Sequence, residues 1–263
     1  MTVLHHEPAG AGRELLLVHA GVADMRMWEP QWGALAERFR VLRCDLRGFG
    51  GSPPGDAPYS HVGDLVELLD HVGFRSPAVI GASYGGKVAI DLALAEPERV
   101  SALVLAAPAL ADHDWSEQAE AFDAAEEEAL ERGDIDAAVE LNLRTWVGVE
   151  ALHETVAPMT RRAFELQLDA GAEELEPPAA RLAGLRAPTL VLVGDRDLPD
   201  FGAIAQRIAA EAPGARTDVL PGAAHLLTME RPGEFLTRAL AFLDSQELPY
   251  AARARSHGGG RRG

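Results

Sequence analysis

The chain has 263 residues, 41 of them acidic and 24 basic, and its formal net charge is −17. This length suits one domain, or one domain with a large insertion. The acidity argues against nucleic-acid binding and against docking on anionic lipid, because both require a basic surface. Hydrophobic residues make up 47% of the chain, which is enough for an aliphatic core. The single cysteine excludes a disulfide framework.

The N-terminal segment lacks the pattern of an export signal. Its apolar run from Leu15 to Val18 is short and follows charged residues, and no apolar run reaches the ~18 residues of a membrane span. We therefore expect a cytoplasmic protein with neither a membrane nor a nucleic acid as partner. The oligomeric state, homodimer included, is left open by the sequence.

Short apolar runs alternate with amphipathic stretches through the first hundred residues and again near the end. This alternation is typical of βαβ units and predicts an α/β protein whose mostly parallel central sheet has helices on both faces. The predicted strands are 14–19, 40–44, 77–80, 100–106, 189–193 and 216–220. The predicted helices are 31–38, 61–71, 84–95, 201–211 and 233–244.

Between residues 111 and 180 the strand pattern stops, and apolar residues recur at helical spacing. We predict a helical lid here, with breaks at Gly133 and at Pro177-Pro178, inserted into a core made of residues 1–110 and 181–246. The segment holds 19 acidic and four basic residues, a net charge of −15, whereas the rest of the chain carries −2. Most of these carboxylates are expected on solvated faces. The alternative is a lid that disfavours anionic substrates. Residues 247–263 are rich in glycine and arginine and are expected to form a disordered basic tail.

A serine stands at a sharp turn between a predicted strand and a predicted helix. Gly81 and Gly85 flank Ser83 in a Gly-x-Ser-x-Gly pattern, and small residues at these positions let strand and helix approach closely. Such a turn exposes the hydroxyl as a nucleophile and brings the Tyr84 amide to a helix N-terminus, where it can stabilise an oxyanion. A serine that merely caps its helix is the alternative.

A serine nucleophile needs a base, and the base needs an acid that orients it. Asp197 and His225 each follow a predicted strand, so the chain order is Ser, Asp, His. Asp195 is the main rival of Asp197. Asp200 is a weaker rival and is interpreted as the N-cap of the next helix.

The turn after the first strong strand is a second source of oxyanion donors. Gly21 is our choice for the second amide, with Val22 as the alternative. His19 is interpreted as a structural residue that anchors this loop.

Five segments resemble the α/β-hydrolase superfamily, and within it lidded serine hydrolases such as 3-oxoadipate enol-lactonases and small carboxylesterases. They are HAGVADMRMW, CDLRGFGGS, GASYGG, GDRD and GAAHLLTMERP. The resemblance implies an α/β-hydrolase fold with the lid inserted after the sixth strand. It also implies Ser83 as nucleophile, Asp197 as acid, His225 as base, and the Gly21 and Tyr84 amides as the oxyanion hole. Asp45 and Arg47 are expected to form a pair that stabilises the fold.

The chain departs from this family pattern in two places. Ala20 stands where members usually have a glycine after the first histidine. Members usually begin with a β-hairpin, but the residues before Glu14 can supply only one strand, around Val3 to His6. We therefore expect the first family strand to be missing.

The expected reaction is hydrolysis of a carboxylic ester or lactone of a small, largely apolar substrate through an acyl-enzyme, without cofactor or metal. A carbon–carbon bond hydrolase and a cofactor-free perhydrolase share the same triad and stay as alternatives. A ligand receptor with residual hydrolysis is a third. The candidate apolar wall of the substrate pocket is Trp28, Trp115, Phe122, Trp146 and Met159.

Three other features are interpreted as structural. Lys87 follows a glycine-rich turn that resembles a phosphate-binding loop, but Val88 replaces the required Ser or Thr, so Lys87 is expected to pair with Asp91. Cys44 lies in an apolar strand and is expected to fill the core. The remaining histidines lack a motif; those at 61, 71, 113 and 153 are expected on the surface or in the lid.

Overall fold

The computed structural model describes residues 3–168, 170–171, 173–175 and 181–246. The predicted tail of residues 247–263 and the predicted break at Pro177-Pro178 lie outside the described residues. No helix of the described part is long and apolar enough to cross a membrane.

Seven strands of the described chain form one sheet, in the spatial order β1-β3-β2-β4-β5-β6-β7. They are β1 His6–Gly10, β2 Arg13–Val18, β3 Phe39–Cys44, β4 Ala78–Ala82, β5 Ala102–Ala106, β6 Thr189–Gly194 and β7 Arg216–Leu220. β1 pairs antiparallel with β3, and every other pairing is parallel. The sheet is therefore mostly parallel, as predicted, although the N-terminal strand begins at His6 and not near Val3.

The α-helices connect these strands and also form the long insertion between β5 and β6. They are α1 Glu29–Ala36, α2 His61–Val72, α3 Tyr84–Ala95, α4 Glu117–Glu131, α5 Ile135–Trp146, α6 His153–Leu168, α7 Pro199–Glu211, α8 Leu227–Glu230 and α9 Pro232–Asp244. Short 3₁₀ turns cover η1 Met25–Trp28, η2 Pro97–Arg99, η3 Glu150–Leu152 and η4 Leu182–Gly184.

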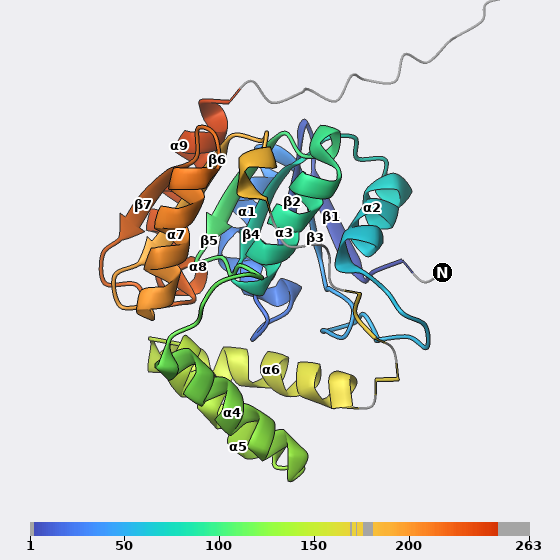
Figure 1. Ribbon diagram of the computed structural model, residues 1–263. Coiled ribbons are helices and arrows are strands. Elements are labelled where there is room, and N and C mark those ends of the chain that lie inside the picture. Colours follow the sequence, from blue (N-terminus) through green and yellow to red (C-terminus); the bar gives the residue numbers. More distant parts are fainter. Residues whose placement is uncertain (1–2, 169, 172, 176–180, 247–263) are drawn as a thin grey trace, which may run out of the picture.

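The direction of the crossovers decides which face each helix covers. The β2-α1-β3 crossover runs toward one edge of the sheet, whereas those through α2, α3 and α7 run toward the other. Right-handed crossovers in opposite directions place their helices on opposite faces. In agreement, α2 packs against α3, and α1 packs against α9 (Figure 1).

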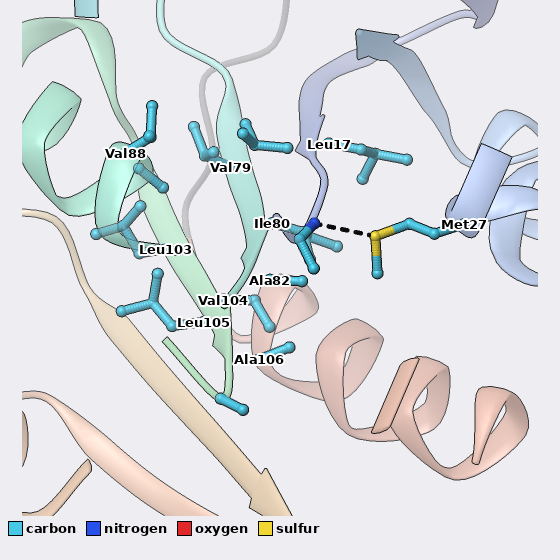
Figure 2. Packing of buried hydrophobic residues seen from close by; sticks show 14 of the residues in the cluster. Leu17, Met27, Val79, Ile80, Ala82, Val88, Leu103, Val104, Leu105 and Ala106 are labelled. Carbon is cyan, nitrogen blue, oxygen red and sulfur yellow. Dashed lines mark hydrogen bonds between the residues drawn. The ribbon is translucent and has the colours of Figure 1, made fainter. Parts of the chain in front are cut away.

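The core is continuous and aliphatic. Val79 and Ile80 of β4, Leu103 and Val104 of β5 and Val88 of α3 are at most 1% exposed, and Figure 2 shows them packed together. These strands are buried on both faces, which explains their unbroken apolar sequences. β4 is the central strand of the sheet and ends at Ala82, so the turn that carries Ser83 begins at the middle of the sheet.

The insertion forms a separate layer at one end of the sheet. Helix α4 packs on α5 and α5 on α6, and Figure 1 shows the three below the strands. Gly133 separates α4 from α5 with φ of +70°, a left-handed conformation that glycine adopts without strain. The insertion follows the fifth strand in chain order. The resemblance implied an insertion after a sixth strand, and the described residues place five strands before it.

Candidate active site

The turn after β4 holds Ser83 in a strained backbone conformation. Its φ is +50° and its ψ is −117°, outside the regions that L-residues normally occupy. The Ser83 amide donates to the Ala106 carbonyl over 2.8 Å. A Cβ on Gly81 would lie 2.5 Å from the Gly85 oxygen, and one on Gly85 would lie 2.2 Å from the His19 oxygen. The two glycines are thus required by close backbone contacts, and the turn has the geometry of a nucleophile elbow.

Ser83, His225 and Asp197 lie in one chain of hydrogen bonds. Ser83 Oγ is 2.8 Å from His225 Nε2, and His225 Nδ1 is 2.9 Å from Asp197 Oδ2. The His225 and Asp197 side chains are both 3% exposed. The carboxylate accepts the proton on Nδ1, which leaves Nε2 free to accept the serine hydroxyl. This arrangement can deprotonate Ser83 during attack on a carbonyl.

The two rival aspartates have other contacts. Asp195 accepts a hydrogen bond from the Gly222 amide over 2.6 Å and so joins the turns after β6 and β7. Asp200 does not cap α7, because the N-cap is Leu198. Instead Asp200 accepts hydrogen bonds from the amide and the hydroxyl of Ser116, at 2.8 and 2.7 Å. Our interpretation of Asp200 as an N-cap is therefore wrong.

The loop after β2 lies against the elbow. A Cβ built on Gly21 would be 3.4 Å from Tyr84 Cβ, so the two candidate oxyanion donors belong to neighbouring backbone segments. His19 anchors this loop, as predicted: its Nδ1 donates to the Ala20 oxygen and its Nε2 accepts from the Leu46 amide. Burial lowers the pKa of His19, which keeps the ring neutral, as this bonding requires.

The site lies where the strand order reverses. The chain leaves β2 toward β3 on one side and leaves β4 toward β5 on the other, and β2 and β4 are neighbours. Loops at the carboxyl ends of two such strands diverge and leave a crevice between them. Gly21 and Ser83 lie on these two loops.

A cavity of about 560 Å³ opens at Ser83 and His225. The core contributes Gly21, Val22 and Tyr84 to its wall. The predicted pocket residues Trp115, Phe122 and Trp146 also line it. Such a volume accommodates a small-molecule substrate.

The other two predicted pocket residues lie elsewhere. Trp28 is fully buried in the core, with its ring centroid 6.4 Å from that of Phe235, and Met159 is 2% exposed within α6. Neither lines the cavity. An aromatic or thioether side chain predicts burial but does not distinguish a core from a pocket wall.

Comparison with known proteins places this architecture in a family. The model of the Alpha/beta hydrolase family matches residues 15–239. The chain belongs to this family.

Relatives of this alpha/beta hydrolase include several ester hydrolases. It is 31% identical to the pimeloyl-[acyl-carrier protein] methyl ester esterase of Edwardsiella ictaluri, over 94% of the chain and 100% of the relative. It is 28% identical to a thermophilic esterase from Thermogutta terrifontis, with a TM-score of 0.76 over 92% and 93% of the two chains. The enol-lactonase from Burkholderia xenovorans LB400 shares the fold, with a TM-score of 0.77 over 92% of this chain and 96% of the lactonase. The two sequences are 24% identical. The chain spans 64% and 38% of the lengths of two other curated relatives.

Three of the structural interpretations can be checked in this alpha/beta hydrolase. Lys87 Nζ is 3.4 Å from Asp91, as predicted. Cys44 is fully buried, and burial raises the pKa of its thiol, so it is a core residue as expected. Asp45 and Arg47 do not pair with each other: Asp45 accepts from His5 and from backbone amides, while Arg47 binds Asp64 over 2.5 and 2.8 Å.

His61 corrects another expectation. It is 4% exposed at the start of α2 and lines the cavity, so it is neither a surface nor a lid residue. Burial lowers the pKa of His61 to about 3. Its ring packs edge-on against Tyr59 and Tyr84, with centroids 5.3 and 5.6 Å away.

Several lining residues were not identified from the sequence, among them Glu126, Asn142 and Phe201. Glu126 stands four residues after Phe122 in a predicted helix, and residues at this spacing share a face. That signal was available. Phe201 lies on α7, outside the predicted lid, and only its contact with His225 at 4.3 Å between centroids identifies it.

Proposed function

We propose that this alpha/beta hydrolase cleaves carboxylic esters or lactones of small, largely apolar substrates through a Ser-His-Asp triad. The single observation that carries the proposal is the chain of hydrogen bonds from Ser83 through His225 to Asp197. The ester hydrolases among the relatives support the same class of reaction.

Acylation begins when Ser83 Oγ attacks the carbonyl carbon while His225 Nε2 takes the hydroxyl proton. Asp197 accepts the hydrogen bond from His225 Nδ1 and stabilises the imidazolium cation that forms. The carbonyl oxygen becomes an oxyanion that accepts hydrogen bonds from the Tyr84 and Gly21 amides; loss of one such donor typically costs about 10²- to 10³-fold in rate. The intermediate then collapses, the acyl–oxygen bond breaks, and the alcohol leaves with the proton from His225.

Deacylation repeats these steps with water. His225 removes a proton from the water, whose oxygen attacks the acyl carbon, and the second intermediate releases the acid and returns the proton to Ser83. A lactone follows the same route, with its alcohol still attached to the acyl group. No step requires a cofactor.

We further propose that residues 111–180 act as a lid over this site. Trp115, Phe122 and Trp146 come from this segment and contribute apolar side chains to the cavity wall. Substrate choice is then set by the insertion, whereas the triad and the oxyanion donors belong to the core.

The test is hydrolysis of para-nitrophenyl acetate and butyrate and of a small lactone by the wild type and by Ser83→Ala. We expect turnover by the wild type and a loss of at least about 10³-fold in the variant. Turnover that does not depend on Ser83 would refute the mechanism. Turnover of β-diketones but of no ester would favour the carbon–carbon hydrolase, and absence of all turnover would favour a receptor.

A further inference from the structure

One wall of the cavity carries negative charge without a counterion. Asp123 and Glu126, both on α4, line it beside Phe122. Among the described residues, neither carboxylate has a cationic side chain within ion-pair distance. A part-buried carboxylate without a cation is unfavourable, and a positively charged ligand would relieve this.

Asn142, on α5, holds Glu126 in a defined position. This side chain is 4% exposed, and its amide nitrogen donates to Glu126 Oε1 and, over 2.9 Å, to the Ala138 carbonyl. Both partners are acceptors, so the amide must present its nitrogen to them. Its Oδ1 accepts no hydrogen bond from the described residues, although Asn142 lines the cavity.

The wall therefore presents two acceptors, the Glu126 carboxylate and Asn142 Oδ1, while both N–H groups of Asn142 are already used. A complementary ligand must donate hydrogen bonds and carry positive charge. A protonated amine satisfies both conditions. Burial raises the pKa of Glu126, because the charged carboxylate loses part of its contact with water. A bound cation would offset this loss of solvation.

The surroundings of Glu126 favour a cation as well. Phe122 and Trp146 line the same cavity, and aromatic faces attract ammonium groups. An adjoining hollow of about 480 Å³ is lined by Asp123, Glu126, Glu127 and Glu131, which share one face of α4. Carboxylates that continue from the cavity to the exterior guide cations inward.

We propose that the preferred substrate carries a protonated amine, which binds at Glu126 and Asn142 while the ester carbonyl lies at Ser83. This inference rests on the proposed function and adds the chemical class of the substrate. It assigns the acidity of α4 a role in specificity, beside the solubility that its exposed carboxylates provide.

The test compares para-nitrophenyl esters that differ only in charge. We suggest para-aminomethyl derivatives of phenylacetic and phenylpropionic acid, the para-ethyl isosteres, and the para-carboxymethyl analogues. The rigid ring prevents attack of the amine on its own ester. We expect kcat/KM of the wild type to be roughly tenfold higher for the ammonium ester than for the neutral isostere, and lowest for the anion. Added salt should reduce the preference.

Glu126→Gln should remove the preference, so that kcat/KM for the ammonium ester falls to the value that the same variant shows for the neutral isostere. The glutamine oxygen can still accept from Asn142, so the fold of α4 and α5 is retained. Glu128→Gln is the matched control, because Glu128 lies on the same helix with its side chain 72% exposed. This control should keep the preference of the wild type.

Each result has a defined consequence. Equal turnover of charged and neutral esters, dependent on Ser83, would overturn the amine site and leave the proposed function intact. A preference that persists in Glu126→Gln would overturn the assignment to Glu126. If no ester is hydrolysed in a Ser83-dependent manner, the proposed function fails, and the amine site fails with it.

Discussion

The indole ring of Trp146 packs on the imidazole of His225, with 4.8 Å between ring centroids. Phe201 packs on the same imidazole, at 4.3 Å. Trp146 is the last residue of α5, within the insertion, whereas Phe201 comes from α7 beside the sheet. The insertion therefore contacts the candidate base directly, in addition to contributing residues to the cavity wall.

A second contact joins the insertion to the loop of His225. The Glu230 carboxylate accepts hydrogen bonds from the Ala224 amide, over 2.6 Å, and from the Gly148 amide, over 3.0 Å. Gly148 belongs to the insertion and Ala224 precedes His225. The orientation of the imidazole thus depends on segments that are far apart in the sequence.

Replacing Trp146 tests this packing. Trp146→Leu should lower kcat for para-nitrophenyl acetate by about ten- to hundredfold, because a displaced imidazole no longer accepts the hydrogen bond from the Ser83 hydroxyl in good geometry. Trp146→Phe keeps an aromatic ring and should retain most of the rate. The acetate is used because it is too small to need the rest of the cavity wall. If kcat of Trp146→Leu is within twofold of the wild-type value, Trp146 does not position His225.

The choice of Asp197 over Asp195 can be tested by identical substitutions in one turn. Asp197→Asn removes the acceptor that holds His225 Nδ1–H, and kcat should fall by about 10⁴-fold. Among the described residues, the Asp195 side chain accepts a hydrogen bond only from the Gly222 amide, so Asp195→Asn should leave kcat within about twofold. The measurement is steady-state hydrolysis of the same ester. Equal losses in both variants would contradict the assignment.

The close approach of α3 to β2 makes a prediction for stability. Gly85→Ala would place a Cβ 2.2 Å from the His19 carbonyl oxygen, and we expect the free energy of unfolding to fall by about 2–4 kcal/mol. Gly202→Ala is the matched control, because no atom lies within 4 Å of its Cβ position on α7. This variant should gain about 0.5–1 kcal/mol from helix propensity. Urea denaturation measures both, and a Gly85→Ala variant as stable as the wild type would contradict the contact.

The buried histidines make stability depend on pH. The pKa of His61 is about 3 in the folded chain, against 6.5 for a solvated histidine, and burial also lowers the pKa of His19. Between about pH 3 and pH 6.5, His61 is protonated in the unfolded chain and neutral in the folded chain. The folded state is therefore destabilised as the pH falls through this window, and its full stability is present above pH 6.5.

His61→Phe should weaken this dependence, because phenylalanine cannot bind the proton and keeps the packing on Tyr59 and Tyr84. The slope of the unfolding free energy between about pH 4 and 6 should drop by up to ~1.4 kcal/mol per pH unit. Chemical denaturation at several pH values measures it. An unchanged slope would show that His61 titrates alike in the folded and unfolded chains.

The sequence alone determined most of the fold because its signals are local. Unbroken apolar runs predicted the parallel strands, and six of the seven strands lie within two residues of the predicted positions. The elbow was predictable for a steric reason. The neighbouring backbone atoms leave no room for a side chain at positions 81 and 85, and both residues are glycine. The chain order of Ser83, Asp197 and His225 indicated which loops meet, because parallel strands all end at one edge.

Other features were decided only by the tertiary structure. The sequence predicted aromatic residues in the insertion but could not separate Trp146, on the cavity wall, from Met159, inside the layer. The pairing of Glu126 with Asn142 joins two helices, and the partner of Arg47 is Asp64, not Asp45. These contacts depend on how each helix is rotated against its neighbours. Packing of the whole core sets that rotation, so it is not encoded in any short stretch of the chain.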